Sequence, residues 1–512
     1  MNKKIGILLT VCVAVLAINL DTTIVNVALP SISENLGAGT RQLQWIVDGY
    51  NLAFAALVLA AGSLSDRFGR RPALILGLLG FAVASLVGAF VGSSGALIAV
   101  RVAMGVFAAL IFPTTLSIIS NTFPDRKERA AALGAWGAVV GIGVAAGPVT
   151  GGFLLEHFSW GSVFVALVPV AVLAAGMAVV LVPESRDPGV PALDFVGLGL
   201  SVAMLTALTY TIIEAPSRGW SSLATLGGFG LAATLLLVFV LVERRSDHPM
   251  LDVSLFRDRR FSAASGAVTI TFFALFGFIF LITQYMQFIR GYGTLSTGAR
   301  ILPVATSIAV ASVVGAVLAP RIGTRAVVTA GLLMFAGSFL WISTVSVDAS
   351  YAAVIVPQMV LMGLGMGLIS TPATESILLV LPPARAGVGS AVNDATRELG
   401  GTLGVAVVGS IFSSVYAAHL ADGLFGTLST DQQAQAAGSV GAAQGIASGS
   451  DALTAAMREA FMAGLHTSCA VIGLLCLAGA VAALFALPGR LRPAVDREAW
   501  GVRTDQGLLL AD

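Results

Sequence analysis

Leu64-Ser65-Asp66-Arg67-Phe68-Gly69-Arg70-Arg71 is a short charged segment between two long apolar runs. A similar segment, Leu318-Ala319-Pro320-Arg321-Ile322-Gly323-Thr324-Arg325, recurs later in the chain at an equivalent place between two apolar runs. This repetition predicts two halves of six helices each, related by an axis through the bundle. The apolar runs between the halves are then an insertion of two helices.

The composition indicates a membrane protein. Hydrophobic residues make up 57% of the 512 residues and charged residues only 11%, whereas a soluble domain carries about 25% charged residues. A helix needs about 20 apolar residues to cross the hydrocarbon core of a bilayer. The long apolar windows predict an all-α protein with 14 transmembrane helices, at residues 5–29, 43–63, 73–92, 96–120, 131–155, 160–183, 193–213, 223–243, 262–289, 296–319, 325–345, 351–380, 386–416 and 465–487.

Basic residues predict the orientation, because short cytoplasmic loops carry an excess of Lys and Arg. With the N-terminus inside, most of the 28 basic residues fall on the cytoplasmic side, and the external segments hold only Arg41, Arg218, Arg290 and Arg458. Both termini are therefore expected in the cytoplasm. The first apolar run continues to Pro30 without a small-residue cleavage pattern, so we interpret it as an uncleaved span.

The predicted organisation has four parts. Residues 1–183 form the N-terminal six-helix half, residues 184–261 the two inserted helices with their linkers, and residues 262–487 the C-terminal half. The C-terminal half contains an external loop, 417–464, whose Ala, Gly, Ser and Gln content predicts a mobile or weakly helical segment. Residues 488–512 have mixed charges and no long apolar period, which predicts an unstructured cytoplasmic tail.

Several classes of site lack support in the sequence. The cysteines, Cys12, Cys469 and Cys476, lie in apolar segments, which argues against a disulfide framework or a metal centre. No nucleotide-binding loop or nucleophile motif supports an enzyme or a cofactor, and a net charge of +1 points to no nucleic acid. The four histidines lie in loops or at span ends, at His157, His248, His419 and His466. Any proton that crosses the membrane within the spans must therefore be carried by carboxylates.

Asp21 stands out because a carboxylate deep in an apolar span costs roughly 2.5–3.5 kcal/mol on insertion scales. A rise of 1.5 Å per residue places Asp21 about 24 Å from the cytoplasmic start of its span, and Asp48 and Arg101 about 8 Å below the external face. All three then share the outer third of the membrane. Asp21 or Asp48 could neutralise Arg101, either as a protonation switch or as a static pair that joins helices.

A second charged group lies in the span 386–416. Asp394 and Glu398 are four residues apart and share a helix face, with Arg397 adjacent. They lie about 12 and 18 Å from the cytoplasmic end. Either at least one carboxylate titrates during transport, or the three groups form a compensated cluster that fixes packing. Glu375, near the inner end of its span, could simply extend to the interface.

Two segments suggest structural devices. Gly143, Gly147 and Gly151 recur every four residues, which gives a smooth face for close helix packing. Asp66 with Arg67, Arg70 and Arg71 could form a cytoplasmic gate, or these charges could only set the topology. Pro320 takes the place of the acidic residue in the second copy, so we expect such a gate in the first half alone.

Five segments, in order, resemble the fourteen-helix drug:proton antiporters of the major facilitator superfamily. They are Leu20–Pro30, Gly62–Arg71, Gly143–Gly152, Pro249–Phe256 and Gly387–Asp394. Two departures stand beside the resemblance. Met104 occupies a position of the helix 4 motif where the family usually has Gln, and Gly161-Ser162 replaces a common Arg-Trp pair after Trp160.

The resemblance implies proton-coupled multidrug efflux of amphipathic or cationic compounds across a bacterial cytoplasmic membrane, by a monomer without cofactor or metal. It adds weight to Asp21, Arg101, Asp394 and Glu398 as proton-coupling residues, with Asp48, Arg397 and Glu375 as further charged candidates. It also implies that the helix 5 segment, with Gly143, Gly147, Pro148, Gly151 and Gly152, makes a hinge-like contact between the halves that favours exchange over uniport. The alternative is a dedicated exporter of a self-made antibiotic or another specific solute; a membrane-embedded enzyme or receptor has less support.

Overall fold

A computed structural model describes residues 3–186, 194–246, 249, 251–379, 386–487 and 489. The predicted tail, residues 488–512, therefore lies outside the described residues apart from residue 489, and so does His248. The described part of the chain is helical and has no strand. Fourteen of its helices are long and apolar enough to cross a membrane, which confirms the predicted class and number of spans.

The first half contains α1 (Lys3–Leu36), α2 (Thr40–Phe68), α3 (Arg70–Gly88), α4 (Ser94–Thr122), α5 (Arg126–His157), α6 (Ser162–Val165) and α7 (Leu167–Leu181). The insertion contains α8 (Phe195–Arg218) and α9 (Leu223–Glu243). The second half contains η1 (Val253–Arg257), α10 (Arg259–Gln284), η2 (Tyr285–Ile289), α11 (Thr294–Ile322), α12 (Thr324–Ile342), η3 (Tyr351–Ile355), α13 (Val356–Leu379), α14 (Ala386–Asp422) and α17 (Asp451–Ala486).

Short polar side chains determine where several helices begin. Ser93, Ser222 and Ser450 each accept a hydrogen bond from the backbone three residues ahead and so cap α4, α9 and α17. Asp194 and Asp258 do the same for α8 and α10. A side-chain oxygen at this position satisfies a backbone N–H that the helix itself leaves without a partner. The loops between apolar runs therefore supply the start signals for the spans.

The repeated segment forms the same turn in both halves. Gly69 joins α2 to α3 with φ 123°, and Gly323 joins α11 to α12 with φ 98°. Each glycine N–H donates a hydrogen bond of 3.0 Å to the backbone oxygen four residues earlier, at Ser65 and Ala319. A side chain would be strained at these φ values. The helices around the turns match in length as well, with 29 and 19 residues in each half.

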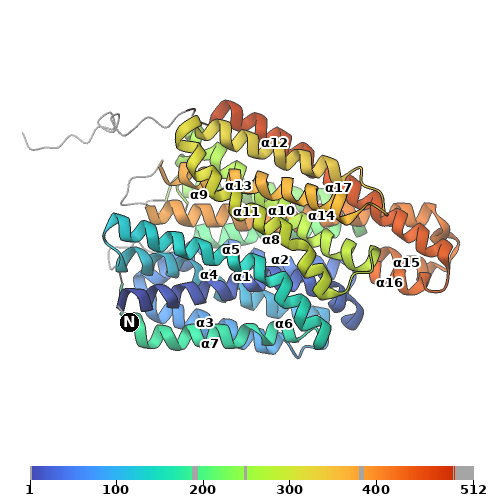
Figure 1. Cartoon of the computed structure of the whole chain (residues 1–512), viewed down its shortest axis with the longest axis horizontal. Helices are drawn as coiled ribbons and strands as arrows, with labels where there is room; N and C mark the ends of the chain where they lie inside the picture. Colours follow the sequence, from blue (N-terminus) through green and yellow to red (C-terminus); the bar gives the residue numbers. More distant parts are fainter. Residues whose placement is uncertain are drawn as a thin grey trace, which may run out of the picture.

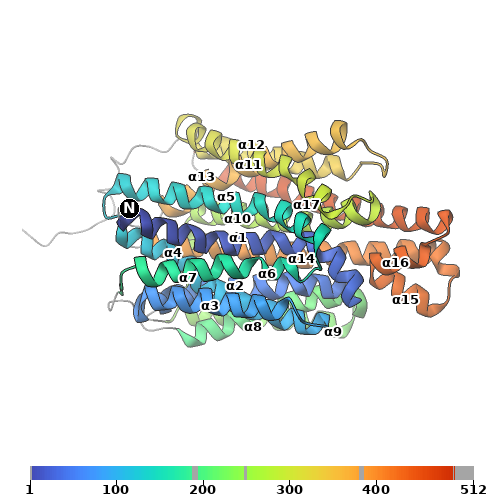
Figure 2. The same cartoon turned by 60° about the horizontal axis from the view of Figure 1, so that its bottom comes forward.

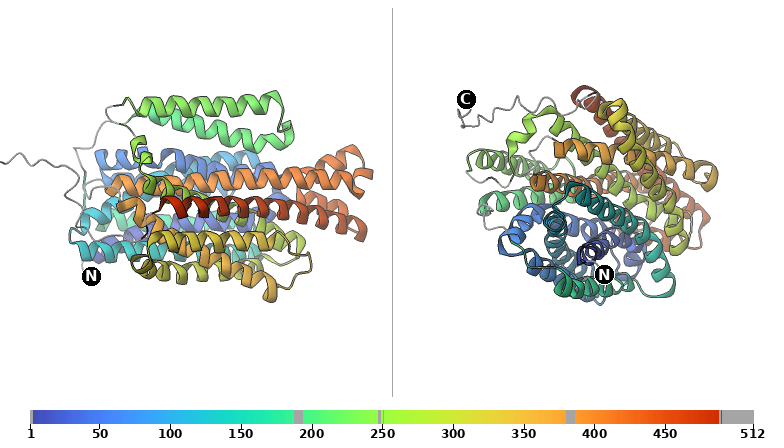
Figure 3. Two further views of the ribbon diagram at one scale, coloured as in Figure 1. Left: turned by 90° about the horizontal axis from the view of Figure 1, so that it is seen from above. Right: turned by 60° about the vertical axis from the view of Figure 1, so that its left-hand side comes forward.

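The two halves lie side by side. The end-on view in Figure 3 separates the blue and teal helices of the first half from the yellow and red helices of the second. Two helix pairs make the main contact between them, α2 with α14 and α5 with α11. The green hairpin of α8 and α9 lies at the edge of the bundle, where α8 packs against α2 and α14. The insertion therefore flanks one junction of the halves.

The segment between α14 and α17 forms a helical cap, which comprises η5 (Leu424–Thr427), α15 (Thr430–Gly438) and α16 (Val440–Ala447). Figures 1 and 2 show α15 and α16 projecting beyond the bundle at the end opposite the N-terminus. The sequence predicted either a mobile or a weakly helical segment at residues 417–464, and the structure has helices there. We call this end of the bundle the cap end, and the end where α1 begins the N-terminal end.

Candidate functional site

Asp21 on α1 and Arg101 on α4 form a buried ion pair in the first half. One terminal nitrogen of Arg101 lies 2.7 Å from both carboxylate oxygens of Asp21. The Arg101 Nε donates to the backbone oxygen of Ile46 at 3.0 Å, and the guanidinium carbon lies 4.3 Å from the ring centre of Tyr50. Both charged side chains are buried, with exposed fractions of 0% and 1%. Between the two carboxylates considered from the sequence, Asp21 is therefore the partner of Arg101.

Asp48 on α2 is buried as fully as Asp21 but differently placed. Its exposed fraction is 0%, and neither carboxylate oxygen has a hydrogen-bond partner among the described residues. No ion pair joins it to a basic residue in that part of the chain. An ionised carboxylate in such a setting is costly because nothing compensates its lost hydration. The structure therefore pairs Asp21 with Arg101 and leaves Asp48 as a separate buried acid.

The second charged group lies on α14, as its spacing predicts. A terminal nitrogen of Arg397 is 4.0 Å from a carboxylate oxygen of Asp394, whose other oxygen is buried without a hydrogen-bond partner. The guanidinium carbon of Arg397 lies 4.5 Å from the ring centre of Phe272 on α10. Glu398 is partly buried one turn further along α14. The group is therefore an acidic site with one weakly held cation.

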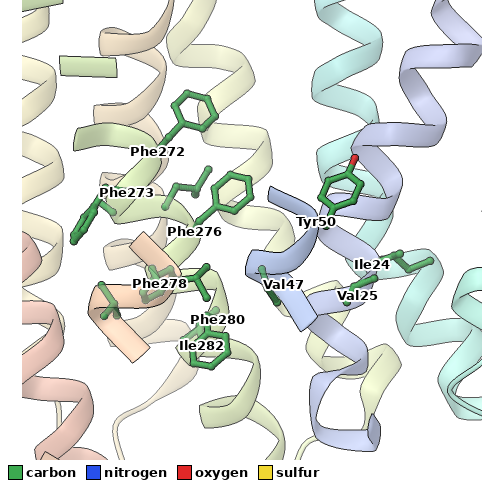
Figure 4. Packing of buried hydrophobic residues seen from close by; sticks show 14 of the residues in the cluster. Ile24, Val25, Val47, Tyr50, Phe272, Phe273, Phe276, Phe278, Phe280 and Ile282 are labelled. Carbon is green, nitrogen blue, oxygen red and sulfur yellow. The ribbon is translucent and has the colours of Figure 1, made fainter. Parts of the chain in front are cut away.

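Phe272 belongs to an aromatic surface on α10. Its ring centre lies 6.2 Å from that of Phe276, and Figure 4 shows both side chains on one side of the helix with Phe273 on another. The Phe276 ring lies against Gly401 of α14, where an added Cβ would come within 3.4 Å of it. The Phe276 ring therefore lies close to the α14 backbone, one turn from Arg397.

Tyr50 lies beside the charged pair of the first half. Its ring covers the Arg101 guanidinium. The Tyr50 hydroxyl has no hydrogen-bond partner among the described residues, and the same is true of one side-chain atom each of Asn26 and Asn51. These buried polar atoms on α1 and α2 form a polar surface of the first half, whereas α10 contributes the aromatic surface of the second.

The helix 5 segment makes two different close contacts. At Gly143 and Gly151 an added Cβ would meet Asn19 at 2.8 Å and Ile24 at 2.7 Å, and at Gly147 it would meet Thr23. These three glycines thus face α1 of the same half.

Contact with the other half comes from Pro148 and Gly152. Thr294 on α11 donates to the backbone oxygen of Gly152 at 3.1 Å, and an added Cβ at Gly298 would collide with the backbone oxygen of Pro148.

An apolar cavity adjoins this contact. It lies between α1, α5, α10, α11 and α13, and its lining includes Val27, Val144, Pro148, Ile282, Ile301 and Met362. Polar groups contribute little to its surface. Its volume is about 30 Å³, whereas sites for drug-sized ligands measure roughly 300–1,000 Å³, so in this state it is a small apolar gap beside the helix 5 segment.

The predicted gate residues are tied together within the first half. Arg70 Nε lies 2.6 Å from an oxygen of Asp66 across the Gly69 turn, and Arg71 donates to the backbone oxygen of Val179 at 2.6 Å. Arg67 lies over the ring of Phe68. These contacts join α2, α3 and the end of α7. Glu375, by contrast, is exposed on α13, next to Thr374, whose hydroxyl donates to the side-chain oxygen of Asn393 on α14 at 3.1 Å.

The halves are joined near the cap end. Among the described residues, their mutual hydrogen bonds involve Gln44 with the Ala406 backbone (3.1 Å), Gln287 with the Val27 backbone (3.0 Å), Thr294 with Gly152, and Ser33 with Ser439 (3.3 Å). Gln44 also reaches the Val405 oxygen and the Ser410 hydroxyl. This pattern closes the cap end of the interface.

Sequence reasoning did not select Tyr50, Phe272 or Gly298 as site residues. Phe272 is one of 27 phenylalanines and Gly298 one of 58 glycines. Their importance comes from what lies opposite them on another helix, which their own neighbours in sequence do not reveal. The polar run at residues 48–51 within an apolar span was a usable signal for Tyr50.

Comparison with known proteins shows which family this chain resembles in sequence. The family model of the Major Facilitator Superfamily matches residues 11–405. Multidrug efflux pump LfrA of Mycolicibacterium smegmatis is 36% identical over 471 residues, which cover 91% of this chain and 93% of that protein. The tetracenomycin C resistance and export protein of Streptomyces glaucescens is 34% identical, covering 80% of this chain and 76% of that protein. Methyl viologen resistance protein SmvA of Salmonella typhimurium is 32% identical, covering 94% and 97%.

Solved structures agree on the fold. A bacterial homolog of the human lysosomal transporter Spinster, in an inward-facing and unoccupied conformation, superposes with a TM-score of 0.68 at 16% identity and covers 96% of this chain and 100% of that one. At this identity the likeness concerns the fold alone. The sequence relationships confirm the resemblance deduced from the five segments. This chain belongs to the Major Facilitator Superfamily, as a relative of multidrug efflux pumps and antibiotic-resistance exporters of the drug:proton antiporter type.

Proposed function

We propose that the protein exports amphipathic or cationic small molecules across a bacterial cytoplasmic membrane in exchange for protons. The observation that carries the proposal is a carboxylate–arginine pair inside the spanning helices of each half, Asp21 with Arg101 and Asp394 with Arg397. The relatives named as multidrug efflux pumps and resistance proteins support the direction and the class of cargo.

The energetics of the fully buried Asp21–Arg101 pair suit a switch between two states. Breaking a buried ion pair by neutralising one partner costs about 3–5 kcal/mol. Moving a two-state equilibrium from 1:99 to 99:1 takes about 5.5 kcal/mol. Protonation of one buried carboxylate can therefore supply most of the bias between inward- and outward-facing states, provided that the two states bind the proton differently.

We infer that the cap end is external and that both termini lie in the cytoplasm. The basic turns that contain Arg70 and Arg325 lie at the opposite end of the bundle from the cap, and an excess of basic residues favours the cytoplasmic side. In this state the two halves are joined near the cap end, which is the external side under this orientation. A monomer is sufficient for this mechanism.

Transport in proteoliposomes tests the proposal. The wild-type protein, reconstituted with an imposed pH gradient, is expected to move ethidium, a lipophilic cation, toward the acidic side. Asp21→Asn and Asp394→Asn are each expected to lower that rate at least tenfold, whereas Glu375→Gln, which alters an exposed carboxylate, is expected to leave it within twofold. Uphill ethidium movement that ignores the pH gradient, or persists in both Asn variants, would contradict proton coupling through these groups.

A dedicated exporter of one specific solute is the second candidate, and one comparison favours it. The relative from Streptomyces glaucescens is named as a resistance and export protein for tetracenomycin C. The same proteoliposomes distinguish the candidates. A folded wild-type protein that moves one polycyclic antibiotic but neither ethidium nor methyl viologen would support the dedicated exporter.

A further inference from the structure

Arg101 and Arg397, the arginines of the two charged groups, are held very differently. Arg101 makes hydrogen bonds of 2.7–3.0 Å to Asp21 and Ile46 and is 1% exposed. Arg397 lies 4.0 Å from Asp394, beyond hydrogen-bond range, and its side chain is 25% exposed. Its guanidinium makes no hydrogen bond within the part of the chain that the structure describes. Coulomb attraction and the Phe272 ring alone hold Arg397 in place, so it is the arginine that another cation can displace.

Asp394 has unused capacity to bind a cation. Its side chain is 5% exposed, and the oxygen remote from Arg397 is buried without a hydrogen-bond partner. An ionised carboxylate offers about four acceptor positions. Glu398 lies one turn away on the same helix face and adds a second negative charge. Two carboxylates facing one weakly held guanidinium leave this site short of positive charge.

The aromatic side of the site suits an organic cation. The Arg397 guanidinium lies 4.5 Å from the centre of the Phe272 ring, well within the roughly 6 Å over which a ring face attracts a cation. The Phe276 ring, whose centre lies 6.2 Å from that of Phe272, extends the aromatic surface along the same side of α10 (Figure 4). A cation that carries aryl groups can contact the rings of both Phe272 and Phe276. A metal ion or a simple ammonium gains little from the Phe276 ring.

The two helices that carry this site, α10 and α14, are also packed closely together. An added Cβ at Gly400 or Gly404 of α14 would collide with the backbone oxygens of Thr269 and Phe273 on α10, so the two backbones are in close contact. The Thr269 hydroxyl lies 3.3 Å from the backbone oxygen of Thr396 across the same contact. Close backbone packing fixes the distance between the Phe272 ring and the Asp394 carboxylate. The mobile component of the site is the long Arg397 side chain.

We propose that Arg397 is a built-in surrogate for the transported cation, and that a monovalent aryl cation displaces it from between Asp394 and Phe272. The inference rests on the proposed export of cations, and it identifies the binding site and its selectivity. With Arg397 in place the site is never empty of positive charge, and a neutral compound cannot substitute for the guanidinium at Asp394. Arg397 thereby makes the site selective for cationic over neutral cargo.

Equilibrium binding of tetraphenylphosphonium to the purified full-length protein tests this directly. Arg397→Gln removes the competing cation, so we expect the Kd for tetraphenylphosphonium to fall about tenfold. Arg397→Lys keeps the charge but loses the planar contact with Phe272, and we expect the Kd to fall by about two- to threefold.

Three controls accompany these variants. Asp394→Asn combined with Arg397→Gln should abolish the gain in affinity. Phe272→Leu should raise the wild-type Kd several-fold, and tetraphenylborate, an anion of the same shape, should show no gain in any variant.

Folding is checked by gel filtration and thermal unfolding, and if Arg397→Gln is unstable the Arg397→Lys comparison decides. An unchanged or higher Kd in folded Arg397→Gln overturns the inference. Proton-driven ethidium transport, measured on the same preparations, separates this failure from that of the proposed function. Wild-type transport without a gain in affinity refutes only the surrogate role, and a gain in affinity without proton-driven transport supports the site and refutes the coupling. If neither the gain in affinity nor proton-driven transport is observed, the surrogate role and the proposed function are both overturned.

Discussion

A single terminal nitrogen of Arg101 on α4 lies 2.7 Å from both carboxylate oxygens of Asp21 on α1. This pair joins two helices of the first half in a fully buried setting. Replacement of Asp21 by Asn leaves Arg101 buried without a counter-ion, which costs about 3–5 kcal/mol. We expect Asp21→Asn to lower the midpoint of thermal unfolding in detergent by several degrees and to abolish proton-driven transport.

A second substitution separates the two effects. Arg101→Gln in the Asp21→Asn background removes the uncompensated charge, so stability should largely return while transport stays absent. Transport that recovers together with stability would mean that the pair has only a structural role.

Asp48 offers a contrasting case on the neighbouring helix. It is buried without any hydrogen-bond partner among the described residues, so its replacement by the nearly isosteric Asn leaves no buried charge behind. We expect Asp48→Asn to change the free energy of unfolding by no more than about 1 kcal/mol. Thermal unfolding of Asp48→Asn and Asp21→Asn, measured side by side at neutral pH, checks this. Equal destabilisation by both substitutions would show that Asp48 has an ionic partner in the native protein.

Gly298 determines how closely α11 approaches α5. An added Cβ there would collide with the backbone oxygen of Pro148, so Gly298→Ala must separate the halves at this contact. We expect transport to fall at least tenfold. Gly141→Ala on α5 is the matched control, because no heavy atom lies within 4 Å of its added Cβ, and Ala for Gly in a helix is favourable by up to about 1 kcal/mol. Normal transport by folded Gly298→Ala would show that this close approach is dispensable.

The cap bridges the two halves through Ser33 on α1 and Ser439, which precedes α16. Their hydroxyl oxygens are 3.3 Å apart, and an added Cβ at the nearby Gly441 would lie 3.5 Å from the Ser33 oxygen. If the cap end opens during transport, these residues must separate. We expect Ser33→Cys with Ser439→Cys to form a disulfide under oxidation, to lower transport at least tenfold and to recover with dithiothreitol. The three native cysteines are buried.

Each single cysteine variant is the control for oxidation itself. It should retain transport with and without oxidant. A fully cross-linked double variant that transports at the wild-type rate would show that the cap and α1 stay together throughout the cycle.

The number of spans, the repeated turn and the two charged groups were predictable because each depends on residues close together in sequence. A run of about 20 apolar residues spans a bilayer whatever surrounds it. The segments ending at Gly69 and Gly323 show their equivalence directly, and Asp21 is conspicuous because its apolar neighbours make a carboxylate costly. Asp394 and Glu398 share a face because helical geometry requires it.

Other features depend on how the helices rotate and approach one another. Asp21 and Asp48 lie at similar predicted depths, so only the orientation of α1 and α2 about their axes decides which carboxylate meets Arg101. The same holds for Phe272, which lies beneath Arg397 because glycines at 400 and 404 bring α14 against α10. The sequence by itself therefore determined the membrane-spanning fold and the depth of its charges, since hydrophobic length and helical rise are local properties. Tertiary structure decided the partner of each charge, because pairing requires side chains from different helices to meet across a packed interface.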